Sequence, residues 1–308
     1  MRTAFLFSGQ GAQYPGMMKD IAEQCPEAKA VFDTADRSLG RSISHLCFSG
    51  EQEELNLTHN TQPCVLAADL AAYRAIRAAD IKPEAVGGFS LGEYAALAAA
   101  GVIGIEDAFL LVQKRADYMQ EAVPVGKGSM AAIMKQTAAE VEQLCGKADG
   151  YVVPANYNCP GQIVISGETE AVDRILEIAK ERKIRAMKLA VSAPFHCRMM
   201  EPAVERLKGP LSSTAFSSPS VPVYMNVDAR PERETEQIRK KLLLQAMSPV
   251  RWEETLRNMS DAGIDTFVEL GPGRTLAGFV KKTLGEEVRC FSVTDIDTLN
   301  RTINELRG

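Results

Sequence analysis

The chain has 308 residues, of which 45% are apolar and 24% charged. This composition is typical of a globular protein, and it excludes a collagenous or an intrinsically disordered chain. Lys and Arg number 35 against 40 Asp and Glu, so the net charge is −5, which argues against a general nucleic-acid-binding protein.

The cysteines and histidines indicate neither a disulfide framework nor a metal site. The seven cysteines contain no Cys-x-x-Cys pair, and with three histidines they form no metal-binding cluster in the sequence. The first apolar run, residues 4–7, is too short for a signal peptide, and no run approaches the ~20 apolar residues that cross a bilayer. We therefore expect a cytoplasmic protein without a membrane partner.

The first third of the chain alternates between strand and helix patterns. Residues 3–7 (TAFLF) predict a buried strand in the middle of a sheet, ended by a Ser-Gly-Gln-Gly turn. An Ala- and Leu-rich helix is expected at 63–80 with Pro63 at its start, then a strand at 86–89 and a helix at 91–100. This alternation predicts an α/β fold with a mostly parallel sheet and helices on both faces.

The middle of the chain follows a different order of elements. Strand, helix, two strands, helix and strand are expected at 129–134, 137–144, 151–156, 162–166, 169–182 and 184–191. That βαββαβ order is typical of a ferredoxin-like subdomain. We place it at 127–192, inserted into a large α/β-hydrolase-like catalytic domain of residues 1–126 and 193–308. A loop, an amphipathic helix and a strand are expected later, at 212–222, 232–247 and 266–270.

A Gly-x-Ser-x-Gly turn lies at residues 88–92 (GFSLG), where a predicted strand meets a predicted helix. Glycines two residues before and after the serine let the two elements approach closely, and such a bend presents the serine as a nucleophile. Ser90 would also lie at the positive end of the helix dipole. The alternative is an ordinary serine at a helix start.

A serine nucleophile needs a base, and His45, His59 and His196 are the only imidazoles in the sequence. His45 lies in a helix-like stretch and His59 in a polar segment, where a solvated or hydrogen-bonded side chain is the ordinary explanation. His196 lies where the insert returns to the large domain, so we expect it at a crevice between domains, where small-molecule sites form. The alternative is a histidine that caps a helix beginning near Arg198.

Two other segments are candidates for binding. Gly9-Gln10-Gly11 follows the first strand and offers backbone N–H groups to an anion, as an oxyanion hole requires. A dinucleotide site is disfavoured, because Tyr14 stands where Gly-x-Gly-x-x-Gly needs its third glycine. Arg115, on a predicted helix at 106–120, is by default a solvated or ion-paired side chain.

Together these segments resemble the malonyl-CoA:acyl carrier protein transacylase family, which includes acyltransferases of polyketide synthesis. The matching stretches follow one another over most of the chain, and among them are FSGQGAQ, GFSLGEYAAL and RADYMQEAVP. They lie at 7–13, 60–63, 88–97, 115–124, 128–133, 160–167, 193–199, 248–252 and 269–273.

The resemblance implies an enzyme that moves a malonyl group from malonyl-CoA to the pantetheine thiol of an acyl carrier protein, in fatty-acid or polyketide synthesis. Ser90 would take the malonyl group as an ester, and His196 would be the base. Gln245 would orient His196 through its main-chain carbonyl, in place of the usual acidic third member. The backbone N–H groups of Gln10 and Leu91 would form the oxyanion hole.

The resemblance also assigns residues to substrate binding. Arg115 would pair bidentately with the free carboxylate of malonate, a task suited to a guanidinium. Gln62 would line the same pocket, and Phe195 would crowd an α-methyl group. The coenzyme A thioester is a substrate, so no cofactor or metal is expected, and we expect a monomer. The chain departs from the family at Phe89, where His is usual, which leaves acyl preference and the ratio of transfer to hydrolysis open.

Two other functions stay open at this point. An acyl hydrolase on the same scaffold would clear acyl groups from carrier proteins. Arg115 argues against it, because simple acyl chains have no carboxylate for a guanidinium to pair with. A non-catalytic module that docks carrier proteins would make Ser90 incidental.

Overall fold

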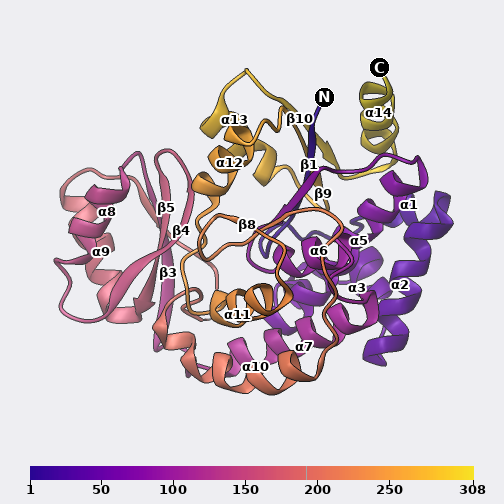
Figure 1. Cartoon of the computed structure of the whole chain (residues 1–308). Coiled ribbons are helices and arrows are strands. Elements are labelled where there is room, and N and C mark those ends of the chain that lie inside the picture. The colour runs from indigo at the N-terminus through magenta and orange to yellow at the C-terminus, as the bar shows by residue number, and fades with distance from the viewer. Residues whose placement is uncertain (192) are drawn as a thin grey trace.

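Two β-sheets organise the chain, and helices pack against both of them (Figure 1). The structure is a computed structural model, and it describes residues 1–191 and 193–308. The strands are Thr3–Phe7 (β1), Ala85–Gly88 (β2), Gly128–Met134 (β3), Val152–Cys159 (β4), Gln162–Glu168 (β5), Ala186–Lys188 (β6), Val223–Tyr224 (β7), Pro231–Glu232 (β8), Thr266–Leu270 (β9) and Arg289–Val293 (β10). The larger sheet has the order β10-β9-β1-β2-β7-β8, and the smaller one β4-β5-β3-β6.

Helices make up most of the rest of the described chain. They are Lys19–Gln24 (α1), Pro26–Leu39 (α2), Ile43–Ser49 (α3), Gln52–Leu55 (α4), Thr58–Ala78 (α5), Gly92–Ala99 (α6), Ile105–Glu121 (α7), Ala138–Cys145 (α8), Thr169–Glu181 (α9), Glu201–Ser213 (α10), Thr235–Gln245 (α11), Trp252–Asp261 (α12), Thr275–Leu284 (α13) and Ile296–Arg307 (α14). A short 3₁₀ turn, Arg198–Met200, leads into α10. None of the helices in the described part of the chain combines the length and apolar character of a bilayer-spanning segment.

Strand β1 lies inside the larger sheet, as its apolar sequence predicts. It pairs in parallel with β2 on one side and β9 on the other, and all its residues are buried. Phe5 and Phe7 pack with the helices α5 and α6, whereas Ala4 and Leu6 pack with α12 and α13 on the opposite face. The pairing of β7 with β8 is antiparallel. The prediction of a mostly parallel sheet covered on both faces is confirmed.

Helix α5 begins at Thr58, five residues before the predicted start at Pro63. A proline inside a helix has no N–H for the carbonyl four residues earlier, here that of His59. That carbonyl accepts hydrogen bonds from Arg41 Nη2 at 2.8 Å and from Gln113 Nε2 at 3.3 Å instead. The prediction that Pro63 starts the helix is therefore wrong, because side chains from other elements replace the missing bond.

The smaller sheet has the ferredoxin-like strand order. Its pairings β4–β5, β5–β3 and β3–β6 are all antiparallel, which is the arrangement that a βαββαβ sequence gives. Ala131 and Ile133 of β3 pack with residues of α8 and α9, and these helices lie on the side of the sheet away from the larger domain (Figure 1). Met130 and Ala132 alternate with them and face the larger domain, in a cluster with Phe195.

The sequence predicts boundaries of the insert at residues 127 and 192. The strands and helices of the smaller sheet fall within these numbers, and its last strand, β6, is shorter than the predicted strand at 184–191. The division into 127–192 and the flanking parts stays a prediction, and Ser192 lies outside the described residues. Backbone hydrogen bonds join the two parts: Tyr157 N–H donates to Val250 O, and Val250 N–H to Ala155 O, each at 2.9 Å.

Gly88 and Gly92 let β2 and α6 pack closely around the turn, as the Gly-x-Ser-x-Gly pattern predicts. A Cβ on Gly88 would lie 1.9 Å from the carbonyl carbon and oxygen of Gly92. A Cβ on Gly92 would lie 2.3 Å from the carbonyl oxygen of Phe7. Both clashes are with backbone, which cannot move away without breaking the sheet or the helix.

We predict that Gly88→Ala lowers the free energy of unfolding by about 3 kcal/mol or more, because the new methyl overlaps backbone atoms. Gly209→Ala is the matched control, since Gly209 lies in α10 and its new methyl would meet no atom within 4 Å beyond the backbone of its own helix. This change should raise the free energy of unfolding by up to about 1 kcal/mol through helix propensity. Urea titrations of both variants measure this, and equal stabilities would contradict the packing argument.

Candidate active site

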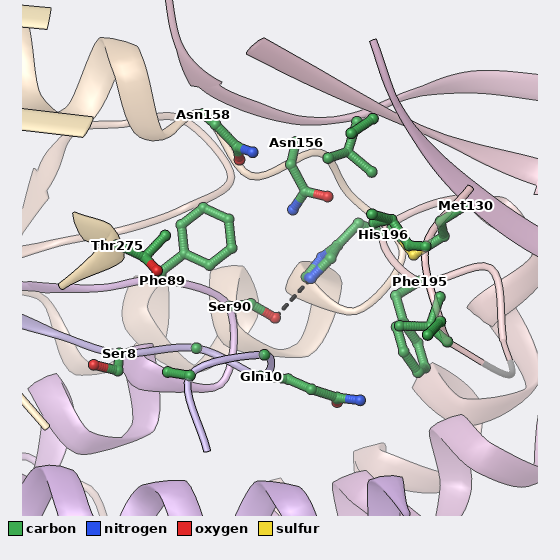
Figure 2. Close-up of a pocket in the computed structure, with 18 of the residues that line it drawn as sticks. Ser8, Gln10, Phe89, Ser90, Met130, Asn156, Asn158, Phe195, His196 and Thr275 are labelled. Atoms are coloured by element: carbon green, nitrogen blue, oxygen red, sulfur yellow. Dashed lines mark hydrogen bonds between the residues drawn. The ribbon is translucent and has the colours of Figure 1, made fainter. Parts of the chain in front are cut away.

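A cavity of about 630 Å³ lies between the two sheets, at the carboxyl ends of β1, β2 and β9. Ligands of open α/β sheets bind at this edge. Figure 2 shows Ser90 and His196 near the centre of the view, with Asn156 and Asn158 above them and Gln10 below. The predicted residues that line the cavity are Gln10, Gln62, Ser90, Arg115, Phe195 and His196.

Ser90 occupies the bend between β2 and α6. Its φ of 54° is in the left-handed region, which costs a non-glycine residue on the order of 1–3 kcal/mol. The bend therefore depends on contacts that hold it. The Ser90 N–H donates to Asn226 Oδ1 at 2.8 Å, and the Ser90 carbonyl accepts from Gln245 Nε2 at 2.6 Å.

The imidazole of His196 reaches the hydroxyl of Ser90. Nε2 lies 2.7 Å from Ser90 Oγ, and Nδ1 lies 3.0 Å from the carbonyl oxygen of Gln245. A carbonyl only accepts hydrogen bonds, so Nδ1 carries the proton, and Nε2 of the neutral ring accepts from Ser90. The geometry thus sets the tautomer in which His196 can take the proton of Ser90.

The environment of His196 keeps its ring neutral. Burial, together with the positive charge of Arg115, lowers the pKa of His196 to about 4. The hydrogen bond from Nδ1 to Gln245 O opposes this shift, because it stabilises the charged ring. Burial and the charge of Arg115 together outweigh this hydrogen bond, so His196 is unprotonated at neutral pH and can accept a proton.

Gln245 contacts the site through both its backbone and its side chain. It is the last residue of α11, where helix carbonyls have no partner within the helix. Its carbonyl faces His196, the contact that the resemblance implies. Its side chain also contacts the site, because Oε1 accepts a hydrogen bond from Arg115 Nη2 at 2.9 Å. No sequence pattern predicted this second contact.

Arg115 is fully buried, so the sequence-based alternative of a solvated side chain is wrong. Nη1 donates to Gln62 Oε1 at 2.6 Å, and Nη2 donates to Ser90 Oγ at 3.1 Å. The guanidinium also lies 5.6 Å from the ring centre of Tyr94. The spacing could have revealed this burial, because Ala108, Leu111, Arg115 and Met119 share one buried face of α7.

The guanidinium of Arg115 forms no ion pair with the carboxylates of the described chain. Among the described residues no carboxylate lies within ion-pair distance of it, and its Nε has no hydrogen-bond partner. Burial raises the pKa of the Glu93 carboxyl to about 8, and the positive charge of Arg115 acts against that rise. A buried cation without a partner is costly, and a ligand carboxylate would relieve that cost.

The two predicted oxyanion donors come from the turn after β1 and from the residue that follows Ser90. Gln10 follows β1 and lines the cavity, and Leu91 is the N-cap of α6, where the first N–H groups lack helical partners. Neither backbone N–H has a hydrogen-bond partner among residues 1–191 and 193–308. Both are therefore free to bind an anion beside Ser90.

Two phenylalanines shape the cavity wall. Phe89, at the position where the resemblance expects His, packs edge-on against Trp252 with ring centres 5.5 Å apart, and also contacts Phe279. Phe195 is 6% exposed and belongs to the apolar cluster with Met130. The other histidines are not in the cavity lining: His45 is exposed and His59 is half-buried.

The sequence analysis missed Asn226 and Glu93. Asn226 lies two residues beyond the buried strand β7, and that strand has only two residues, so no sequence pattern singled Asn226 out. Glu93 is a charged residue within the Ala-rich sequence that follows Ser90, and it is fully buried. The two are joined by a hydrogen bond of 2.7 Å from Asn226 N–H to Glu93 Oε2.

Known proteins that are similar to this chain match it over nearly its whole length, and their names agree. The family described as acyl transferase domain matches residues 4–304. A malonyl CoA-acyl carrier protein transacylase of Bacillus subtilis (strain 168) is 44% identical, with 99% of this chain and 98% of the relative covered. The protein of the same name in Haemophilus influenzae is 42% identical, with 96% of each chain covered.

Solved structures that are similar to this chain are also structures of transacylases. The malonyl CoA-acyl carrier protein transacylase of Coxiella burnetii superposes with a TM-score of 0.96 at 41% identity, covering 100% of this chain and 98% of that one. A malonyl-transacylase solved in complex with a type II polyketide synthase acyl carrier protein also has a TM-score of 0.96, at 38% identity. It covers 99% of this chain and 100% of that one.

The lowered pKa of His196 predicts an unusual pH dependence for Ser90. Reaction of Ser90 with a fluorophosphonate requires a neutral imidazole, so its rate should halve near pH 4 and not near the ordinary 6.5. Arg115→Met removes the charge that contributes to the shift, so the midpoint should move to higher pH. Circular dichroism of the same samples controls for acid unfolding, and a wild-type midpoint near 6.5 would contradict the prediction.

Proposed function

Because this chain belongs to the acyl transferase domain family, and within it to the malonyl CoA-acyl carrier protein transacylases, we propose that it moves a malonyl group from malonyl-CoA to the pantetheine thiol of an acyl carrier protein. The observation that carries the proposal is the buried guanidinium of Arg115, 3.1 Å from the hydroxyl of a serine that contacts a neutral histidine. One cavity thus contains a nucleophile, a base, an anion site and a guanidinium that can bind a carboxylate.

The first half-reaction forms an ester on Ser90. His196 Nε2 takes the hydroxyl proton while Ser90 Oγ attacks the thioester carbonyl of malonyl-CoA. The N–H groups of Gln10 and Leu91 stabilise the tetrahedral oxyanion. When the intermediate collapses, the C–S bond breaks, and the departing sulfur takes the proton from His196 and leaves as coenzyme A.

The second half-reaction returns the enzyme to its starting state. The pantetheine thiol of the carrier protein enters the place that coenzyme A has left. His196 takes the thiol proton, the sulfur attacks the ester carbonyl, and the Ser90 oxygen leaves and recovers a proton from His196. The order of substrates is ping-pong, and side chains and backbone N–H groups of this chain supply every group in the proposed reaction, so the proposal includes no resident cofactor.

Arg115 selects the acyl group in this proposal. The free carboxylate of malonate pairs with the guanidinium, whose unpartnered Nε gives it a further donor. Gln62 fixes the guanidinium from the other side through Nη1. Phe195 lines the cavity, where a ring that crowds an α-methyl group would discriminate by ~1–3 kcal/mol.

The alternatives from the sequence have less support. The relatives reported above carry the names of transacylases, so neither an acyl hydrolase nor a carrier-docking module without activity is favoured. The cytoplasmic location is part of the proposal, and the cysteines support it. In the described part of the chain, which contains all seven, none forms a disulfide. The monomeric state and the choice between fatty-acid and polyketide synthesis stay predictions.

Incubation with radiolabelled malonyl-CoA tests the acyl-enzyme. The wild-type protein should retain about one label per chain after denaturation, and Ser90→Ala should retain none, because it lacks the oxygen that forms the ester. His45→Ala is the control, since His45 is exposed and outside the cavity. With carrier protein added, the label should pass to its thiol. Free malonate appearing faster than loaded carrier would instead identify a hydrolase.

Arg115→Ala should discriminate between acyl donors. Two charge-assisted hydrogen bonds to the malonate carboxylate contribute about 3 kcal/mol together, so kcat/KM for malonyl-CoA should fall about 100-fold. The loss with acetyl-CoA should be less than about 10-fold, because acetyl has no carboxylate and only the contacts of Arg115 within the protein, to Ser90, Gln62 and Gln245, are lost. Initial rates with both donors measure this, and equal losses would remove the carboxylate-binding assignment.

A further inference from the structure

Asn226 holds the backbone on both sides of Phe89 with one side-chain amide. Its Oδ1 accepts the N–H of Ser90 at 2.8 Å, and its Nδ2 donates to the carbonyl of Gly88 at 2.7 Å. Asn226 is 1% exposed and lies two residues beyond the end of β7, the strand next to β2 in the sheet. It therefore connects a neighbouring strand to the bend that carries Ser90, without lining the cavity itself.

The backbone of Asn226 is fixed as firmly as its side chain. Its N–H donates to Glu93 Oε2 at 2.7 Å, and its carbonyl accepts from Arg251 N–H at 3.1 Å. Glu93 lies in α6, directly after the bend. Each polar group of Asn226 thus has a partner, so the amide has little freedom to turn or shift.

A second buried amide completes the support of Ser90. Gln245 Nε2 donates to the Ser90 carbonyl at 2.6 Å and lies 3.4 Å from Asn226 Oδ1. The N–H and the carbonyl of Ser90 are therefore both bound to side chains that come from other elements. Through Gln245 Oε1 the same hydrogen-bond network continues to Arg115.

Such support is what a left-handed serine requires. Ser90 has a φ of 54°, and a residue keeps this conformation only when its surroundings impose it. If the bend relaxed, Oγ would move away from His196 Nε2, which lies 2.7 Å away. A displacement of about 1 Å at a reacting atom costs about 100-fold in rate.

We propose that Asn226 is a positioning residue for Ser90: its amide holds the strained bend so that the hydroxyl stays within hydrogen-bond distance of His196. The inference rests on the proposed role of Ser90 as the nucleophile. Asn226 acts through the backbone of Ser90 and has no contact with substrate. Its effect is therefore on the rate at which Ser90 reacts and not on the binding of the malonyl carboxylate by Arg115.

The test is the rate of Ser90 phosphonylation by a fluorophosphonate, which needs no malonyl-CoA. For Asn226→Ala we expect the pseudo-first-order rate constant to fall between about 10- and 100-fold. The final amplitude should stay near one label per chain, because the amplitude counts folded protein and the rate constant reports the geometry. In acyl transfer, kcat should fall with it, while the KM for malonyl-CoA should change less than about twofold.

Two further variants make the test specific. Asn258→Ala is the matched control, because Asn258 Nδ2 also donates to a backbone carbonyl, that of Ala229 at 2.9 Å, but does not contact the bend. It should react at the wild-type rate. Asn226→Asp keeps the size and the acceptor for the Ser90 N–H but loses the donor to Gly88. It should react at a rate between those of wild type and Asn226→Ala, and it replaces the alanine variant if that does not fold.

Several results would overturn the proposal. Wild-type rate constants in both Asn226 variants, even with a lowered melting temperature or amplitude, would mean that Asn226 only stabilises the fold. An equal loss of rate in Asn258→Ala would mean that any lost hydrogen bond in this region has the same effect. If wild-type Ser90 itself does not react, Ser90 is not the nucleophile, and the proposed function fails together with this inference.

Discussion

The hydrogen bond between Ser90 Oγ and His196 Nε2 is the contact on which the rest of the site depends. The two residues are 106 positions apart in the chain, and both have left-handed backbone, with φ of 54° and 60°. Hydrogen bonds to the backbone of both residues offset this strain. The N–H of His196 donates to the carbonyl of Ala246, and the N–H and carbonyl of Ser90 are bound by the side chains of Asn226 and Gln245. The fold thus uses one helix end, that of α11, to fix both partners.

The second constraint is electrostatic. Arg115 places a positive charge in a buried site next to Ser90, where it lowers the pKa of His196 and forms no ion pair in the described chain. A buried charge without an ion pair is costly, and a malonyl carboxylate would supply a negative charge to pair with it. This arrangement links recognition to chemistry, because the same guanidinium contacts the nucleophile and Gln245. An acyl group without a carboxylate would leave the charge unpaired.

Much of the fold and part of the site could be predicted from local patterns. The strand at 3–7, the Gly-flanked bend at Ser90 and the ferredoxin-like order are local signals, and the structure contains each of them. The start of α5 could not be predicted, because partners distant in sequence compensate for Pro63. Strands β7 and β8 are too short for a periodic pattern. Asn226 contributes through contacts to residues 133 to 138 positions away, which no local pattern shows.

The central claim is that Ser90, His196 and Arg115 form one acyl-binding centre. A crystal structure of the protein after brief exposure to malonyl-CoA tests it most directly. We expect density for a malonyl ester on Ser90 Oγ, with its carbonyl oxygen at the N–H groups of Gln10 and Leu91 and its carboxylate on the guanidinium of Arg115. An ester on another side chain, or a malonyl carboxylate that points away from Arg115 into solvent, would show that these three residues do not form the acyl-binding centre.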